Sequence, residues 1–175
     1  MAGIDNAPAP GSLFCFSPLL IYHIGMNPSL ILALDIGTSS TRAILFDAQA
    51  QPLPDCVVQA PTQMETSSDG GATFDAVALF DQVVASIDQL LHKAGPLGDQ
   101  IAAVTCDTFV GNVLGVDADG KVATPVYTYA DTRNAPDAEI LRLELGADGA
   151  AQAHQRTGTL IHTSYLPARF RWLAR

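Results

Sequence analysis

The most constraining feature of this sequence is an apolar strand that stops at a carboxylate and is followed, after a tight turn, by a second strand. Residues 30–34 form the apolar run, and Asp35 ends it. Residues 37–40, Gly-Thr-Ser-Ser, form the turn, and residues 41–46 alternate with the two-residue period of a strand. Because the turn is so short, the two strands are predicted to form an antiparallel hairpin.

The turn between these strands has the chemistry of a phosphate site. Gly37 allows a close approach of the backbone to a ligand, because it has no Cβ. Several N–H and hydroxyl donors converge there on one anion, so the predicted phosphate-binding residues are Gly37, Thr38, Ser39, Ser40 and Arg42. Asp35 would repel a phosphate and is better suited to Mg²⁺, with water between them, because Mg²⁺ retains much of its hydration shell.

A structural interpretation of the same segment stays open. A strand, a Gly/Ser turn and a second strand occur in many proteins that bind no ligand there. The segment is also not a P-loop, because it lacks the GxxxxGK[ST] pattern and a strand, not a helix, follows the turn.

The next part of the chain predicts one clear helix between strands. Spacings of three and four residues place five apolar side chains on one helix face, namely Val77, Phe80, Val84, Ile87 and Leu91. Thr73 or Asp75 is expected to cap this helix, and Gly95-Pro96 to end it. Strands are predicted at 56–59, 101–106 and 110–116, with a loop at 66–73 and a turn at 117–120.

The last third of the chain predicts two more helices. One covers residues 136–145, with proline in its first turn and Gly146 behind it. The other covers residues 164–173, with Leu166, Phe170 and Leu173 on one face. Three strands, a helix and further strands together indicate a mixed α/β layer fold.

Composition limits the function classes. The chain has 175 residues, 48% of them hydrophobic and 15% charged, which is enough apolar material for a core. The formal net charge of -9 would repel nucleic acid. The cysteines are odd in number and form no CxxC pair, so they indicate neither a disulfide framework nor a zinc site, and a cytoplasmic location fits best; they are Cys15, Cys56 and Cys106.

Residues 1–25 are expected to be an unstructured leader. Their apolar stretch, residues 12–25, is too short to span a bilayer and contains Pro18. No Lys or Arg precedes it, so it lacks the positive region of a secretory signal. Met26, just before the first strand, is the expected natural start, and no membrane partner is predicted.

Three segments together resemble a known family. DIGTSSTRAILFD, residues 35–47, resembles the first phosphate motif of the actin-like ATPase superfamily and, within it, that of the FGGY sugar kinases. Residues 117–133 resemble the FGGY stretch that ends in a Trp/Tyr-x-Asp-x-Arg signature beside the sugar pocket. Residues 157–173 resemble the family's TG…Lys-x-x-Trp-Leu helix. The matches follow the family's order and spacing over residues 29–175, and similarity is closest to the gluconate and xylulose kinase branches.

The resemblance implies a fold and an activity. The fold would be an RNase H-like (actin-like ATPase) α/β domain, a mixed sheet with flanking helices, with residues 26–175 an incomplete N-terminal domain. The activity would be ATP-dependent phosphorylation of a sugar, polyol or sugar acid, gluconate or a pentulose foremost, with ATP and Mg²⁺ as cofactors. A homodimer of the full-length protein is also implied.

The same resemblance suggests sugar-binding residues. They are Asp107, Thr108, Phe109, Asp131 and Arg133. Val110 and Gly111 stand where glycerol and xylulose kinases carry polar sugar contacts, which argues against those two substrates, and Asn112 is a replacement polar group. Asp131 and Arg133 have an alternative interpretation as a loop ion pair that touches no ligand.

Catalysis is the part that the resemblance leaves outside this chain. Transfer to a sugar hydroxyl needs a general base, and in the family that aspartate lies beyond the region matching residue 175, as do the second phosphate motif and the adenosine-binding motif. No catalytic residue is therefore assigned. The alternative interpretation of the chain is a non-catalytic truncated fragment, or a sugar-binding remnant without kinase activity.

Overall fold

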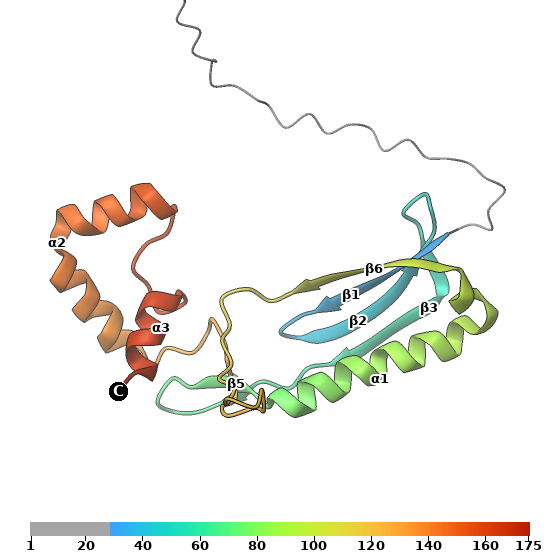
Figure 1. Ribbon diagram of the computed structural model, residues 1–175, viewed down its shortest axis with the longest axis horizontal. Helices are drawn as coiled ribbons and strands as arrows, with labels where there is room; N and C mark the ends of the chain where they lie inside the picture. The colour runs from blue at the N-terminus through green and yellow to red at the C-terminus, as the bar shows by residue number, and fades with distance from the viewer. Residues whose placement is uncertain (1–28) are drawn as a thin grey trace, which may run out of the picture.

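The computed structural model describes residues 29–175, so the expectations for residues 1–25 and Met26 lie outside the described part. Figure 1 shows a sheet with the long helix α1 (Ala76–Ala94) along one face, and a pair of helices at the other end of the molecule. The segment that follows strand β6 (Ile101–Thr108) connects these two regions.

The larger sheet has the strand order β3-β2-β1-β6. Strands β1 (Leu30–Ile36) and β2 (Ser40–Phe46) form the predicted antiparallel hairpin. Strand β6 lies parallel to β1, whereas β3 (Pro52–Pro61) is antiparallel to β2 and longer than the four residues predicted. The parallel pair brings the carboxyl ends of β1 and β6 to the same edge of the sheet.

Helix α1 begins and ends where the sequence predicts. The Asp75 carboxylate accepts a hydrogen bond from the Ala78 N–H at 2.9 Å, and Gly95 follows the last turn. The short 3₁₀ helix η1 (Gly95–Gln100) then leads into β6. Helix α1 packs on β2 and β3, and the core between them consists of Leu30, Leu32, Ala43, Leu45, Cys56, Val58, Leu90 and Ala94.

The face of α1 that meets the sheet differs from the predicted one. Ser86, Leu90 and Ala94 are buried, whereas Phe80 is 67% exposed; Val77, Val84 and Leu91 are exposed too. The helix carries two adjacent apolar stripes. The one with the small side chains Ser86 and Ala94 allows the closer approach to the sheet, and periodicity alone does not distinguish the two.

A second, three-stranded sheet has the order β4-β5-β7. It contains β4 (Glu65–Thr66), β5 (Ala72–Phe74) and β7 (Val126–Tyr127). The predicted loop at 66–73 therefore includes the turn of the β4–β5 hairpin and the strand residues on either side of it. The strand predicted at 110–116 is wrong: this segment makes only isolated bridges. Gly111 has φ 75°, a left-handed conformation that interrupts an extended run.

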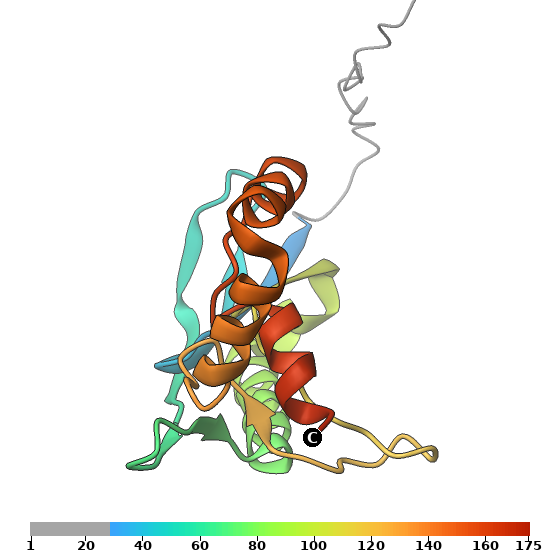
Figure 2. The same ribbon diagram turned by 90° about the vertical axis from the view of Figure 1, so that its left-hand side faces the viewer.

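Two helices complete the described chain. Helix α2 (Ala135–Thr157) consists of two helical segments that meet at Gly146, whose φ of 63° and ψ of 179° are not helical, so the first segment ends where the sequence predicts. Helix α3 (Leu166–Leu173) packs against α2, as Figure 2 shows. Its buried residues are Ala168 and Arg169, whereas Leu166, Phe170 and Leu173, which the sequence places on one face, are exposed.

The mixed sheet with helices on its flanks confirms the α/β prediction. The free thiols among residues 29–175 are Cys56, which is buried, and Cys106, which is exposed. Within the same residues, none of the helices combines the length and the apolar character that a membrane crossing needs.

Candidate functional site

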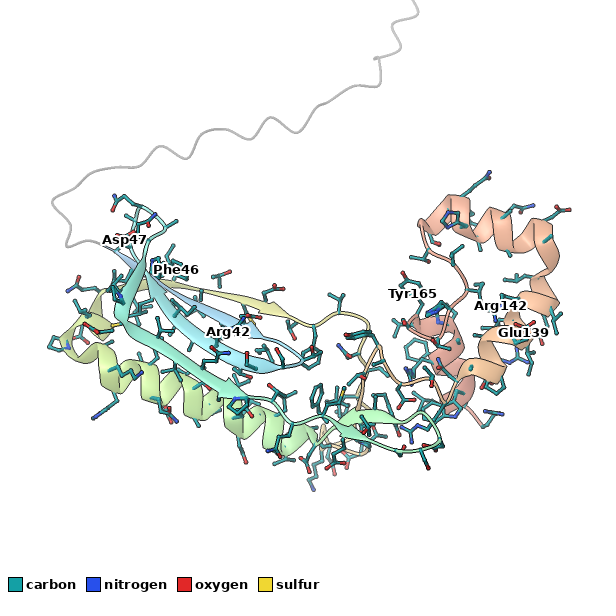
Figure 3. The ribbon with its side chains drawn as sticks, turned by 180° about the vertical axis from the view of Figure 1, so that it is seen from behind. Arg42, Phe46, Asp47, Glu139, Arg142 and Tyr165 are labelled. Atoms are coloured by element: carbon teal, nitrogen blue, oxygen red, sulfur yellow. The ribbon has the colours of Figure 1, made fainter. Side chains whose placement is uncertain are left out.

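A cavity of about 700 Å³ lies between the edge of the large sheet and the start of α3. The turn after β1 and the end of β6 form one side, with Asp35, Gly37, Thr38 and the segment 107–111. Tyr129 and residues 164–166 form the other side. In Figure 3, Arg42 marks the sheet and Tyr165 marks the opposite region at the start of α3. The cavity therefore joins two segments that the sequence analysis treated separately.

The turn after β1, whose residues Gly37 and Thr38 line this cavity, has backbone donors without an acceptor in the described part of the chain. The Gly37 N–H donates to the Ser40 carbonyl oxygen at 3.0 Å and so closes the turn. Among residues 29–175, the N–H groups of Thr38 and Ser39 have no hydrogen-bond acceptor. A Cβ at Gly37 would lie 3.0 Å from the Ser40 carbonyl oxygen, which explains the glycine. Two adjacent donors without an acceptor fit an anion such as a phosphate.

The two hydroxyl residues that end the turn are less available. Ser40 is buried, and its hydroxyl accepts a hydrogen bond from Gln59 Nε2 at 3.1 Å. Thr41 is buried as well and accepts from Gln82 Nε2 at 3.2 Å. Neither lines the cavity. Of the predicted phosphate residues, Gly37 and Thr38 line it, whereas Ser39, Ser40 and Arg42 do not.

Two carboxylates meet at the cavity edge. Asp35 in β1 and Asp107 in β6 are direct register partners on adjacent parallel strands, and both line the cavity. Asp35 forms an ion pair with Arg42 at 2.9 Å, and both side chains are partly exposed. Asp107 accepts only the neighbouring Thr108 N–H, at 2.9 Å, among the described residues.

These oxygens suit a magnesium ion. Mg²⁺ is commonly held by one or two carboxylates together with water and substrate phosphates, and residues 29–175 contain no group of three or more ligating side chains. Asp35 and Asp107 are two such carboxylates, and the Thr38 hydroxyl lies in the same cavity wall.

Asp131 and Arg133 take no part in the cavity lining. Asp131 is fully buried and accepts hydrogen bonds from the Ala72 N–H and from the Arg133 backbone and guanidinium. Arg169, itself 2% exposed, lies 3.3 Å from the same carboxylate. The direct sugar contact expected of Asp131 and Arg133 has no support in this placement, which favours the alternative of a structural ion pair.

The charge state of Asp131 follows from these contacts. Burial by itself raises the pKa of the Asp131 carboxyl, but the hydrogen bonds from Arg133 and from the Ala72 N–H, together with the Arg133 charge, hold that pKa below its usual value. The same carboxylate raises the pKa of Arg133. The cluster is therefore ionised at neutral pH and holds β5, the 128–133 segment and α3 together.

Aromatic rings complete this support behind the cavity. The Arg133 guanidinium lies 5.0 Å from the centre of the Trp172 ring, and Arg169 lies 5.6 Å from the same ring. The Trp172 ring in turn packs edge-on against Tyr127. Asp131 and Arg133 of the signature segment thus shape the cavity from behind by fixing α3, whereas Tyr129 of the same segment lines it.

The far wall contains residues that sequence analysis did not assign to a site. Tyr129, Ser164 and Leu166 are among them, and Tyr165, which had no assigned role, lines the cavity as well. The Ser164 hydroxyl donates to the Tyr129 carbonyl oxygen at 3.0 Å and so links the two segments. In the sequence, only their position within the family motifs pointed to a role in the site. The contact between residues 129 and 164, far apart in the chain, forms this wall of the cavity.

Asn112 and Arg142 position this wall from outside. Asn112 accepts a hydrogen bond from the Tyr129 N–H at 2.9 Å and donates to the Phe109 carbonyl oxygen at 2.8 Å. Its amide therefore links the two cavity walls and does not line the cavity itself. Arg142, on α2 in Figure 3, donates to the Ile161 carbonyl oxygen at 2.8 Å and holds the connection that carries Ser164.

The hairpin of β1 and β2 lies beside the parallel strand β6, and the cavity at their carboxyl ends has an acidic edge, in a mixed α/β domain. Residues 30–175 match the model of the FGGY family of carbohydrate kinases, N-terminal domain. The chain belongs to this family, and the match covers the whole region that the structure describes apart from its first residue.

Curated relatives and solved structures agree with this assignment. The glycerol kinase of Acinetobacter baylyi is 31% identical over 146 residues, which are 83% of this chain and 28% of that protein. The gluconokinase of Bacillus subtilis is 26% identical over 145 residues, 83% of this chain and 27% of that protein. The xylulose kinase of Rhodospirillum rubrum superposes with a TM-score of 0.76 at 26% identity, over 83% of this chain and 29% of that one.

The fold is accordingly the RNase H-like α/β domain of the actin-like ATPase superfamily, present here in part. The chain spans little more than a quarter of the length of the relatives that it matches.

Proposed function

We propose that this chain forms the N-terminal portion of an ATP-dependent kinase that phosphorylates a hydroxyl of a sugar, polyol or sugar acid. The observation that supports it most is the cavity, in which the phosphate-type turn after β1 and the start of α3 face each other. A phosphoryl donor and a polyhydroxy acceptor have to meet in one such space for transfer. Membership of a family of carbohydrate kinases supports the same activity.

The residues divide into roles along the cavity. The N–H groups of Thr38 and Ser39 would bind nucleotide phosphate oxygens, because they have no other acceptor among residues 29–175. Asp35 and Asp107 would hold Mg²⁺, which offsets phosphate charge when bound. Thr108 and Phe109 would border the acceptor sugar. Asp131 and Arg133 would keep α3 in position.

The remaining parts of this proposal rest on the family. A general base is needed to take the proton of the acceptor hydroxyl, and none of the cavity residues is assigned to that role. Asp35 is paired with Arg42, and Asp107 lies on the proposed metal side. A cytoplasmic location and a homodimer of the full-length enzyme belong to the same proposal.

A second candidate is a sugar-binding module without kinase activity. The observation in its favour is that the described cavity has acceptor and phosphate walls but no assigned base. It predicts ligand binding to the purified 175-residue chain without turnover.

One experiment separates the candidates. The purified chain is mixed with Mg²⁺-ATP and a panel of sugars, polyols and sugar acids, and ADP release and ligand binding are both measured. From the chain alone we expect ligand binding without sugar-dependent ADP release. From a longer protein, in which the family's remaining region follows Arg175, we expect sugar-dependent ADP release. If the extended protein also releases no ADP, the kinase proposal is wrong and the binding module remains. Absence of binding in both proteins contradicts both candidates.

A further inference from the structure

The charges around the cavity are distributed unevenly, and this bears on the substrate of the proposed function. At the sheet edge, Asp35 and Asp107 lie side by side and both face the cavity. Arg42 forms an ion pair with Asp35 and offsets that charge. Asp107 has no basic partner among residues 29–175, so it leaves a net negative charge at this end.

The opposite end of the cavity offers no positive charge. Its described lining residues there are Tyr129, Ser164, Tyr165 and Leu166, none of which is basic. The available polar groups are hydroxyls, which donate and accept equally well.

The basic side chains of the family motifs near the cavity are engaged in other contacts. Arg133 and Arg169 both hold the buried carboxylate of Asp131. His162 is not among the lining residues, and its Nδ1 accepts the Ser164 N–H at 3.2 Å. The described lining of the cavity thus contains apolar, hydroxyl and carboxylate side chains and no basic side chain.

From this distribution we infer that the cavity selects an uncharged polyol or sugar and discriminates against a sugar acid. This inference rests on the proposed function and narrows its substrate class. A carboxylate that leaves water needs a cation or several donors to compensate for its desolvation. Away from the N–H donors of the turn after β1, which the proposed function assigns to phosphate, it would meet either hydroxyls or the Asp107 charge. A neutral hydroxyl in the same place loses little, because phenol and serine hydroxyls replace its water contacts.

The test uses matched pairs of ligands that differ only at one terminal carbon. The pairs are glycerol and glycerate, xylitol and xylonate, and glucitol and gluconate. Each is titrated into the 175-residue chain without nucleotide or Mg²⁺, and binding is followed through the backbone amide resonances of residues 107–111 and 164–166. In any pair that binds, we expect the acid to bind at least about tenfold more weakly than the polyol, a difference of ~1.4 kcal/mol.

Two further measurements show whether charge is the cause. Raising the ionic strength should strengthen binding of the acid and leave the polyol unchanged, because salt screens repulsion. The variant Asp107→Asn should narrow the gap at least about threefold, or ~0.7 kcal/mol. It keeps an oxygen for the Thr108 N–H, so folding should be retained. The matched control is Asp119→Asn, in the exposed turn at 117–120, which should change neither affinity.

The outcomes distinguish this inference from the proposal beneath it. An acid that binds as tightly as its polyol, or more tightly, overturns the inference and leaves the kinase proposal intact. A gap that neither salt nor Asp107→Asn reduces also overturns it, because the discrimination would then have another cause. If no ligand of any pair binds, the cavity is not a sugar site of this chain, and the inference falls together with that part of the proposed function.

Discussion

Asp35 and Asp107 stand side by side on adjacent parallel strands, and both face the same cavity. Because β1 and β6 run in the same direction, their carboxyl ends meet at one edge of the sheet. The phosphate-type turn after β1 and the segment after β6 are therefore parts of one site.

Replacing Asp131 should destabilise the fold. Asp131→Ala leaves the buried guanidinium of Arg169 without its carboxylate, and we expect a loss of about 3–5 kcal/mol in the free energy of unfolding. Urea denaturation of the chain measures it. The control Asp119→Ala, in an exposed turn, should change stability by less than about 0.5 kcal/mol. A similar small loss for both variants would show that the ion cluster contributes little.

Stability should also fall in acid because of the same carboxylate. The pKa of Asp131 is lowered in the folded state, so its contribution is present above the unfolded value of about 3.9 and is lost as the pH falls through the lower folded value. Between neutral pH and about pH 5 we expect no effect from this group. Asp131→Asn should flatten the acid limb below about pH 4, measured as the free energy of unfolding against pH. An unchanged limb would contradict the assignment.

Gln82 should stabilise the junction between α1 and the sheet. Its side-chain amide donates to Thr41 Oγ1 and to the Ala60 carbonyl oxygen, each at 3.2 Å. Gln82→Leu leaves these partly buried acceptors without a donor and should lower the free energy of unfolding by about 1–3 kcal/mol. Gln89→Leu, on the exposed side of the same helix, is the matched control. Equal effects of both substitutions would show that the amide is dispensable.

The uncovered face of α1 should make the isolated chain self-associate. Val77 and Phe80 are 55% and 67% exposed on this face, and Val104 of the edge strand β6 is 63% exposed. Phe80→Glu should shift the chain toward monomer in sedimentation velocity at fixed protein concentration. Asp88→Glu, on the same helix, is a control that preserves charge. A monomer before any substitution would contradict this prediction.

In the extended protein described under the proposed function, Asp35→Ala should slow the chemical step. A carboxylate that holds the metal beside the transferring phosphate acts where most charge develops, so kcat should fall by about 10²-fold or more. The sugar KM should change much less, because Asp35 lies on the phosphate side. Steady-state kinetics with varied sugar measures both constants. A raised KM at unchanged kcat would place Asp35 on the sugar side instead.

Local patterns in the sequence were sufficient for the hairpin with its tight turn and for helix α1 with its Asp75 cap and Gly95 end. These features depend on neighbours in the chain: strand period, capping side chains and the absence of a Cβ at Gly37. The family resemblance rested on the same local motifs, and the family match confirms it.

Tertiary structure alone decided which faces are buried and which polar groups reach the cavity. Periodicity shows that α1 is a helix, but the stripe with Ser86 and Ala94 meets the sheet because small side chains allow close packing. Asp131 has a carboxylate that could bind sugar hydroxyls, but it forms an ion pair with Arg169 of α3, which lies far from it in the sequence. Tyr165 belongs to the cavity because the bent helix α2 brings α3 back toward the sheet. Such contacts join residues distant in sequence, so no local pattern encodes them.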